Sequence, residues 1–233
     1  MRRVIIGDVH GCYDELRAIL DKIGPSKSDM IVSIGDMIDY GPKSADVVHF
    51  FMRSNNTFAI LGNHERKHVR FDQGLIAKRH FGKAQLETIR QFKHRFDELH
   101  LSYKETLEYF KTLPLYLNFP EALVVHAGML YGIPLEEQDE KILTGAGFKR
   151  ENQAIANGLF YWCTLYPPDA KPVIFGHLGI GKAPWDLPVR KNLWPLDAGC
   201  VSGGYLTAVV LPEFKIYQVK SLGSHRKCHH YVI

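Results

Sequence analysis

The chain has 233 residues, of which 45% are apolar and 23% charged, with a formal net charge of +4. This composition is typical of globular proteins and excludes disordered, collagen-like and fibrous classes, and the length allows one large domain or a tight pair. The longest apolar runs, such as residues 4–6, span only a few residues, so the sequence predicts neither a membrane-spanning helix nor a secretion signal. We therefore expect a cytoplasmic protein.

The first third of the chain alternates short apolar runs with amphipathic segments. The runs predict strands and the amphipathic segments predict helices. In order, the predicted elements are a strand at 3–7, a helix at 13–23, a strand at 30–34, a helix at 44–52 and a strand at 58–61. This β-α-β-α-β order predicts a sheet with parallel neighbouring strands.

The rest of the chain divides at Pro114. Residues 64–112 are predicted to be mostly helical and polar, and Pro114 ends that block. Strand signals follow at residues 122–125, 173–175, 193–196, 206–211 and 215–219, and the last two predict a hairpin around Pro212-Glu213. Because no linker is visible, we expect one domain over residues 1–223, with a helical insertion at about 64–112 and a C-terminal tail at 224–233.

The positive charge is concentrated in the helical block. Residues 64–111 contain eleven lysines and arginines and seven acidic residues, so this segment carries the whole excess. Such a segment can attract an anionic partner. A solvated helical face gives the same pattern, and for so small an excess we favour it.

Five of the predicted strands end in short polar motifs. The motifs are GDVHG at 7–11, GDMIDYGP at 35–42, GNHE at 62–65, HAG at 126–128 and FGH at 175–177. In open α/β sheets, ligands bind outside the carboxyl ends of the strands. The fold would therefore bring one set of polar side chains to one edge: Asp8, His10, Asp36, Asn63, His126 and His177.

The chemistry of this set points to metal ions. A mixture of carboxylate, imidazole and amide oxygen suits a first-row transition metal better than calcium or magnesium. Six ligands are too many for one open catalytic site but fit two ions bridged by a shared carboxylate, a known arrangement for displacement at phosphorus. A single Asp or His after a strand is usually a cap or a satisfied polar group. The ordered series of five motifs favours a dinuclear site.

The same five motifs, in this order, resemble those of the calcineurin-like metallophosphoesterases. More closely they resemble the phosphoprotein-phosphatase family in its bacterial and phage serine/threonine phosphatase branch. Residues 197–208 are similar to the C-terminal DTG…GGxLTA signature of that branch. The resemblance covers residues 4–211 and implies an α/β fold, a four-layer αββα sandwich of two mixed sheets.

The resemblance also implies roles for individual residues. Asp8, His10 and Asp36 would hold the first metal; Asp36, Asn63, His126 and His177 would hold the second. His64 would be the general acid, oriented by Asp39, and Asp197 would support the site. A carboxylate partner favours the protonated imidazole that a general acid needs. Taken alone, Asp39 could equally be a turn residue ahead of Gly41-Pro42.

The chain departs from the family at two positions that usually hold arginine. Tyr40 follows Asp39 in the second motif, and Thr164 stands where the family tends to have Trp-x-Arg. Those arginines clamp phosphoryl oxygens through a bidentate fork that neither tyrosine nor threonine offers. Other cations, with Arg66 and Arg70 the first candidates, could replace them. Alternatively, the substrate is less charged, or the chain is an inactive relative. We take Tyr40, Arg66, Arg70, Thr164 and Asp197 as candidate substrate-binding residues.

The sequence as a whole predicts a dinuclear phosphoesterase. We expect two divalent ions, with manganese favoured over iron or zinc, and hydrolysis of phosphomonoesters on phosphoprotein Ser/Thr or nucleotides by in-line attack of a metal-bridging hydroxide. The enzymatic alternatives are a phosphodiesterase or a dinucleoside-polyphosphate hydrolase; Glu65 weighs mildly against the latter, because those enzymes tend to have GNHD. The non-enzymatic alternative is a metal-holding binding module. The expected partner is a phosphorylated protein or nucleotide; nucleic acid is not favoured, and no membrane partner is expected.

Overall fold

The computed structural model describes residues 1–145, 155–156, 159–177 and 191–225. Its strands are β1 (Arg3–Ile6), β2 (Met30–Ser33), β3 (Thr57–Ala59), β4 (Tyr116–Asn118), β5 (Leu123–Val125), β6 (Ile155–Ala156), β7 (Leu159–Phe160), β8 (Val173–Phe175), β9 (Leu193–Pro195), β10 (Asp197–Ala198), β11 (Tyr205–Leu211) and β12 (Lys215–Lys220). Its helices are α1 (Tyr13–Ile23), α2 (Ser44–Arg53), α3 (Asn63–Asp72), α4 (Lys83–Leu99), α5 (Tyr103–Thr112), α6 (Glu140–Leu143) and α7 (Tyr161–Leu165), with single 3₁₀ turns at Lys78–His80 and Leu135–Glu137.

The first sheet contains the predicted N-terminal strands. Its order is β10-β11-β1-β2-β3, and β12 also pairs with β11. β1, β2 and β3 are parallel, as the β-α-β-α-β pattern predicts, because α1 and α2 serve as the crossover connections. β11 and β12 form the predicted antiparallel hairpin.

The second sheet has the order β4-β5-β8-β9. β5, β8 and β9 are parallel, and β4, which the sequence analysis does not predict, is an antiparallel edge strand of three residues. The predicted strand at 193–196 belongs to β9 of this sheet, whereas β10, two residues further on, pairs with β11 of the first sheet. The chain therefore crosses between the sheets next to Leu196.

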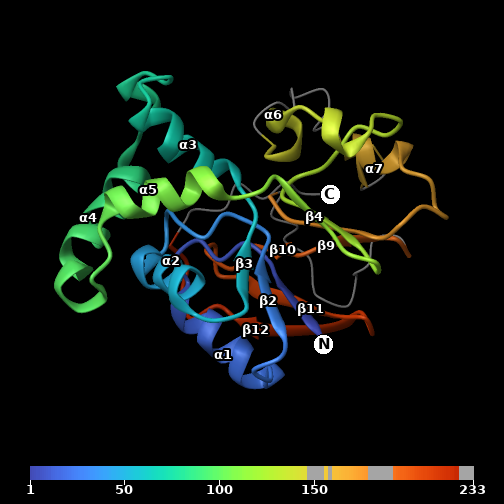
Figure 1. The fold of residues 1–233 in the computed structure, drawn as a ribbon, viewed down its shortest axis with the longest axis horizontal. Coiled ribbons are helices and arrows are strands. Elements are labelled where there is room, and N and C mark those ends of the chain that lie inside the picture. The colour runs from blue at the N-terminus through green and yellow to red at the C-terminus, as the bar shows by residue number, and fades with distance from the viewer. Residues whose placement is uncertain (146–154, 157–158, 178–190, 226–233) are drawn as a thin grey trace.

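The apolar residues separate into three clusters that make four layers. Along β1, Val4 and Ile6 pack with α1 and α2, whereas Ile5 faces Val124 and Ile174 of the second sheet. The outer face of the second sheet packs against residues of α6 and α7, including Leu143 and Trp162. Both sheets are mixed, and the αββα sandwich predicted from the sequence is confirmed (Figure 1). The side-chain alternation along each strand builds the layers.

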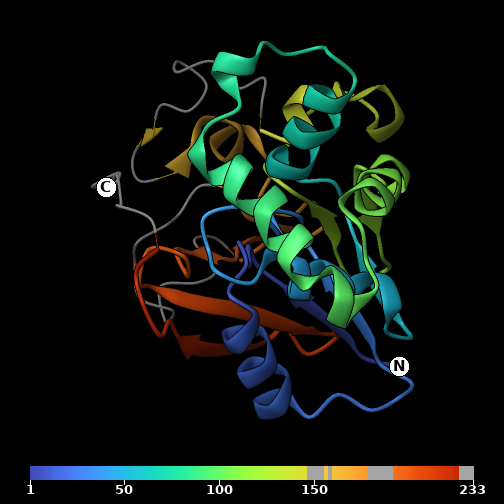
Figure 2. The same ribbon diagram turned by 90° about the vertical axis from the view of Figure 1, so that its left-hand side faces the viewer.

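The predicted helical block is present as α3, α4 and α5, which stand together at one end of the sandwich (Figure 1). α4 packs against α2 and crosses the face nearest the viewer in Figure 2. Among the described residues of the predicted tail, the N–H of His225 bonds to the carbonyl of Val201 at 2.8 Å, and residues 226–233 lie outside the described part. In that described part, none of the helices has the length and apolar character that crossing a membrane requires.

We predict that the anchoring of α4 depends on Phe92. Its ring is fully buried in the core that α2 and α5 share, whereas Phe96, one turn further along α4, is 46% exposed. Phe92→Ala should lower the free energy of unfolding by about 3–5 kcal/mol, because it removes a large buried side chain and leaves a cavity. Phe96→Ala, the matched control, should change it by less than about 0.5 kcal/mol. Urea denaturation of both variants measures this, and equal midpoints would contradict it.

Candidate metal centre

The structure brings the six candidate metal ligands to one place. They follow five strands: Asp8 and His10 come after β1, Asp36 after β2, Asn63, the first residue of α3, after β3, His126 after β5 and His177 after β8. β1, β2 and β3 belong to one sheet and β5 and β8 to the other, so the carboxyl ends of both sheets converge on this point. The geometry matches the sheet-edge argument made from the sequence.

Asp36 lies at the centre of the cluster. Its Oδ2 is 3.5 Å from Nε2 of His10, and its Oδ1 is 3.5 Å from Nε2 of His126. Two groups of three possible ligand atoms share this carboxylate: His10, Asp36 and His64, and Asp36, His126 and His177. A carboxylate common to two such groups is the arrangement that bridges two ions.

Asn63 connects the two histidines of the second group. Its Oδ1 is 3.0 Å from Nε2 of His126 and 2.7 Å from Nδ1 of His177. One amide oxygen and two ring nitrogens therefore face one another, together with Oδ1 of Asp36. An amide oxygen, a carboxylate and two imidazoles are a coherent donor set for one first-row divalent ion.

The imidazoles are held in the orientation that ligands need. Nδ1 of His10 donates to the carbonyl of Ile38 and Nδ1 of His126 to that of Ile34, both at 2.8 Å, so each ring presents Nε2 to Asp36. Burial lowers the pKa of His10 to about 4 and that of His177 to about 3. Both rings are therefore neutral at physiological pH, the state in which a histidine binds a metal. Burial also opposes protonation of His126, but the charge of Asp36 raises its pKa to about 10.

Asp8 supplies the strongest sign that a cation fits here. Its Oδ2 accepts the backbone N–H of His177 at 3.0 Å, whereas its buried Oδ1 has no donor among the described residues. Burial and the nearby charge of Asp197 raise the pKa of Asp8 well above its usual range. A buried carboxylate oxygen without a donor is costly, and a divalent ion beside it would remove that cost. The donor set and this oxygen together fit divalent metal ions.

The backbone is unusual at these positions. His10, Asp36 and His177 have positive φ values of 45°, 50° and 72°, and Asp39 and Tyr40 have values of 71° and 68°. Residues other than glycine rarely adopt this left-handed region, and when they do they concentrate at functional sites. Five of the candidate site residues are held this way, so packing around the cluster imposes their conformation.

Glu65, which the sequence analysis uses only to compare families, fastens two of these loops together. Its carboxylate accepts the backbone N–H groups of Asp36 at 2.9 Å, Met37 at 2.8 Å and Gly62 at 3.2 Å. Glu65 is fully buried, and burial raises its pKa to about 7. This side chain therefore fixes the loop after β2 against the start of α3, and with it Asp36 against Asn63.

His64 and Asp39 form the predicted pair. Nδ1 of His64 is 2.6 Å from Oδ2 of Asp39, and Nε2 of the ring faces Asp36 at 3.9 Å. Burial works against protonation of His64, but the charge of Asp36 and the hydrogen bond to Asp39 raise its pKa above the ordinary value. Asp39 is fully buried and held by side chains, which a simple turn residue would not need.

Three further side chains surround Asp39, and the sequence analysis missed all of them. Nε2 of His68 lies 2.9 Å from Oδ1, Thr88 Oγ1 donates to the same oxygen at 2.7 Å, and Gln85 Nε2 donates to Oδ2 at 2.6 Å. Burial opposes ionisation of Asp39, yet the bonds from His64 and His68 hold its pKa far below the usual range. The available signal was the spacing of His64 and His68, which are four residues apart on one helix face.

The five candidate substrate-binding residues do not form one group. The Tyr40 ring packs edge-on against His10 and His64, with centroids 5.4 Å and 5.2 Å away. Asp197 lies near Asp8, and its Oδ1 accepts the N–H of Gly199 at 3.0 Å. Arg66 and Arg70 line a cavity whose lining includes none of the six candidate ligands, and Arg66 is ion-paired with Glu140. Thr164 is exposed on α7.

Comparison with known proteins gives a consistent result. Residues 1–188 match the calcineurin-like phosphoesterase family. The chain is 30% identical to the asymmetrical bis(5'-nucleosyl)-tetraphosphatase PrpE of Halalkalibacterium halodurans, with 93% of each chain covered. It is 27% identical to the symmetrical bis(5'-nucleosyl)-tetraphosphatase of Aromatoleum aromaticum, covering 94% of this chain and 98% of that one.

Solved structures share the fold at lower identity. A crystal structure named, provisionally, as a diadenosine tetraphosphatase has a TM-score of 0.69 at 23% identity, covering 96% of this chain and 95% of the other. A metallophosphoesterase from Sphaerobacter thermophilus has a TM-score of 0.58 at 20% identity, covering 94% and 88%. These likenesses establish the architecture.

We predict that Gly176 is required for metal binding through Asp8. A Cβ at this position would lie 2.0 Å from Oδ1 of Asp8, whereas a Cβ at Gly223 would lie 3.7 Å from its nearest neighbour. Gly176→Ala should displace the Asp8 carboxylate and weaken manganese binding by about tenfold or more. Gly223→Ala is the matched control and should bind as wild type does. Calorimetric titration with Mn²⁺ measures both, and wild-type affinity in Gly176→Ala would show that Asp8 is not a ligand.

Proposed function

The chain belongs to the calcineurin-like phosphoesterase family and is a metal-dependent phosphoesterase, and on that premise we propose that it hydrolyses dinucleoside polyphosphates. The curated relatives quoted above carry the names of bis(5'-nucleosyl)-tetraphosphatases of both the asymmetrical and the symmetrical kind. This substrate class is one of the alternatives that the sequence left open. The relatives favour it over the phosphomonoesters first expected.

The placement of cations is the structural observation that carries this proposal. Tyr40, an uncharged residue, packs beside His64 where the resemblance leads one to expect arginine, while Arg66 and Arg70 line a neighbouring cavity. A terminal phosphate carries close to two negative charges at neutral pH, whereas an internal phosphate of a polyphosphate chain carries one. A reacting phosphoryl group of lower charge needs fewer cationic side chains beside it. The remaining phosphates of the chain then need cations at a greater distance from the metal centre.

We assign the metal ligands as the sequence predicted. Asp8, His10 and Asp36 would hold one divalent ion, and Asp36, Asn63, His126 and His177 the other. We propose manganese, although the imidazole-rich donor set also suits iron and zinc. When bound, two such ions supply positive charge to the phosphoryl oxygens and activate water at neutral pH.

His64 is proposed to protonate the leaving oxygen. Nδ1 is engaged with Asp39, which leaves Nε2 directed at the cluster, and, against the effect of burial, the charge of Asp36 and the bond to Asp39 raise the pKa of the ring, which favours its protonated form. Asp39 acts as a positioning residue, held in turn by His68, Gln85 and Thr88. Tyr40 offers one hydrogen-bond donor to the substrate, and Asp197 lies beside Asp8, where burial and the charge of Asp197 raise the pKa of that carboxyl group. We further propose that residues 1–223 act as one catalytic domain.

The substrate proposal is tested by comparing three substrates on manganese-loaded protein. We expect diadenosine tetraphosphate to be hydrolysed with a kcat/KM at least about tenfold above that of an aryl phosphomonoester or an aryl phosphodiester, and Asp8→Asn to abolish turnover. Faster hydrolysis of the monoester would contradict the proposal and identify the protein as a phosphomonoesterase. Binding of phosphorylated ligands with no turnover of any substrate would instead favour the metal-holding binding module.

The role of His64 is tested separately. His64→Ala should lower kcat for diadenosine tetraphosphate by about 10²–10⁴-fold, the usual effect of losing a general acid, while the metal content measured by elemental analysis stays at the wild-type level. His94→Ala, which removes an exposed imidazole on α4, is the matched control and should change neither quantity. Parallel loss of metal and activity in His64→Ala would identify His64 as a ligand.

A further inference from the structure

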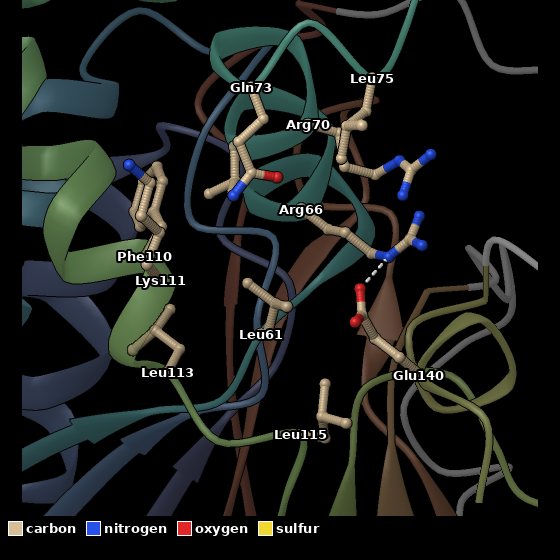
Figure 3. Close-up of a pocket in the computed structure, with 11 residues that line it drawn as sticks. Leu61, Arg66, Arg70, Gln73, Leu75, Phe110, Lys111, Leu113, Leu115 and Glu140 are labelled. Carbon is tan, nitrogen blue, oxygen red and sulfur yellow. Dashed lines mark hydrogen bonds and ion pairs between the residues drawn. The ribbon is translucent and has the colours of Figure 1, made fainter.

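A cavity of about 440 Å³ opens between α3, the end of α5 and α6 (Figure 3). Leu61, Leu113 and Leu115 line it at the sheet side, and Arg66, Arg70 and Lys111 are its cations. Leu75 adds exposed apolar surface, whereas Phe110 is almost wholly buried. Glu140 of α6 is the one carboxylate among the described residues that line the cavity. Its lining mixes polar and apolar side chains, and its volume is in the range of small-molecule sites.

The cavity is next to the candidate metal centre along α3. Leu61 precedes Asn63 by two residues, and Asn63, Arg66 and Arg70 are spaced at i, i+3 and i+7, so they share one side of that helix. The helix rises about 1.5 Å per residue, so Arg70 lies about 10 Å along the axis from Asn63. That span is on the scale of a short polyphosphate chain.

The three cations differ in how they are engaged. Arg66 pairs with Glu140 across the cavity, and Lys111 pairs with Glu108 at 2.8 Å and with Asp72 at 3.4 Å. In the part of the chain that the structure describes, no carboxylate pairs with Arg70. In Figure 3 the side chains of Arg66 and Arg70 extend from α3 to the same side of the helix, and Arg66 bonds to Glu140 there. Arg70 is therefore the cation best placed to receive an anion.

We infer that this cavity binds the distal half of the dinucleoside polyphosphate, meaning the phosphates and nucleoside beyond the reacting phosphoryl group; the inference rests on the proposed function. Arg70 and Arg66 contact the phosphates, for which the guanidinium fork is suited. The base lies on the apolar surface formed by Leu75, Leu113 and Leu115, which are exposed or half-buried, since every base has an apolar face. Glu140 competes with the phosphates for Arg66.

The cavity assignment is tested by measuring ligand binding rather than turnover. Manganese-loaded protein is titrated calorimetrically with a methylene-bridged, non-hydrolysable analogue of diadenosine tetraphosphate. Arg70→Ala should raise the Kd by about tenfold or more, because a charge-assisted contact is lost. Arg79→Ala removes an exposed cation outside the cavity and should stay within about twofold of wild type. Glu140→Gln should lower the Kd, since the competitor for Arg66 loses its charge.

A second ligand separates the phosphate contacts from the base contact. Leu75 is 57% exposed, so Leu75→Ser should fold normally. It should weaken binding of the nucleotide analogue by about three- to tenfold and leave binding of inorganic tripolyphosphate within about twofold, because only the analogue has a base to lose. Arg70→Ala should weaken both ligands.

The outcomes for the cavity and for the proposed function are distinguishable. Wild-type hydrolysis of diadenosine tetraphosphate together with unchanged binding in Arg70→Ala and Leu75→Ser would overturn the cavity assignment and leave the function standing. Failure of wild type to bind the analogue would also overturn it. Analogue binding that depends on Arg70 and Leu75, in a protein that does not turn over diadenosine tetraphosphate, would support the cavity and refute the proposed function.

Discussion

The buried charge of Asp36 is the constraint on which the site depends. A carboxylate removed from water must be surrounded by positive charge or by N–H groups. Here Nε2 of His10 and Nε2 of His126 each lie 3.5 Å from one of its two oxygens, and the backbone N–H of His64 donates to Oδ1 at 3.0 Å. These partners follow β1, β3 and β5, and β5 belongs to the second sheet, so the contacts of one side chain link both sheets at their carboxyl ends. Burial opposes its ionisation, yet His126 and His64 hold the pKa of Asp36 well below its usual range, which keeps its carboxylate charged.

The helix α3 serves two purposes because its residues face two ways. His64 and His68, one turn apart, reach Asp39 from the same side, and Gln85 and Thr88 of α4 complete the set of donors around that carboxylate. Asn63, Arg66 and Arg70 lie on another side, leading from the candidate metal centre to the cavity beside α5. The helical block is therefore part of the site: α4 supports the proposed proton donor, and α3 and α5 supply the cavity proposed for the distal nucleotide.

The position of Glu65 explains why that residue is a poor guide to the substrate. Its carboxylate is fully buried and accepts the backbone N–H groups of Asp36, Met37 and Gly62. An exchange of glutamate for aspartate there would change how two loops are fastened, and the side chain itself faces backbone rather than the open site. The weight that the sequence analysis gave it against dinucleoside-polyphosphate hydrolases is not supported by the relatives, which carry that name. Tyr40, packed against His10 and His64, is better placed to bear on specificity.

The sequence by itself determined the strand and helix order of the N-terminal third, the αββα architecture implied by its motifs, and a set of polar residues that the structure does bring together. These follow from local patterns: apolar runs, helical spacing, and short motifs whose place after a strand fixes the edge they reach. Only the tertiary structure decided the crossing from β9 to β10 beside Leu196 and the partners of Asp39, which lie 25 to 49 residues away. It also decided that Arg66 and Arg70 line a cavity that none of the six candidate ligands lines. Those features depend on how segments far apart in the chain pack against one another. Side-chain volumes and buried charges determine that packing, and they act only once all the layers are in contact.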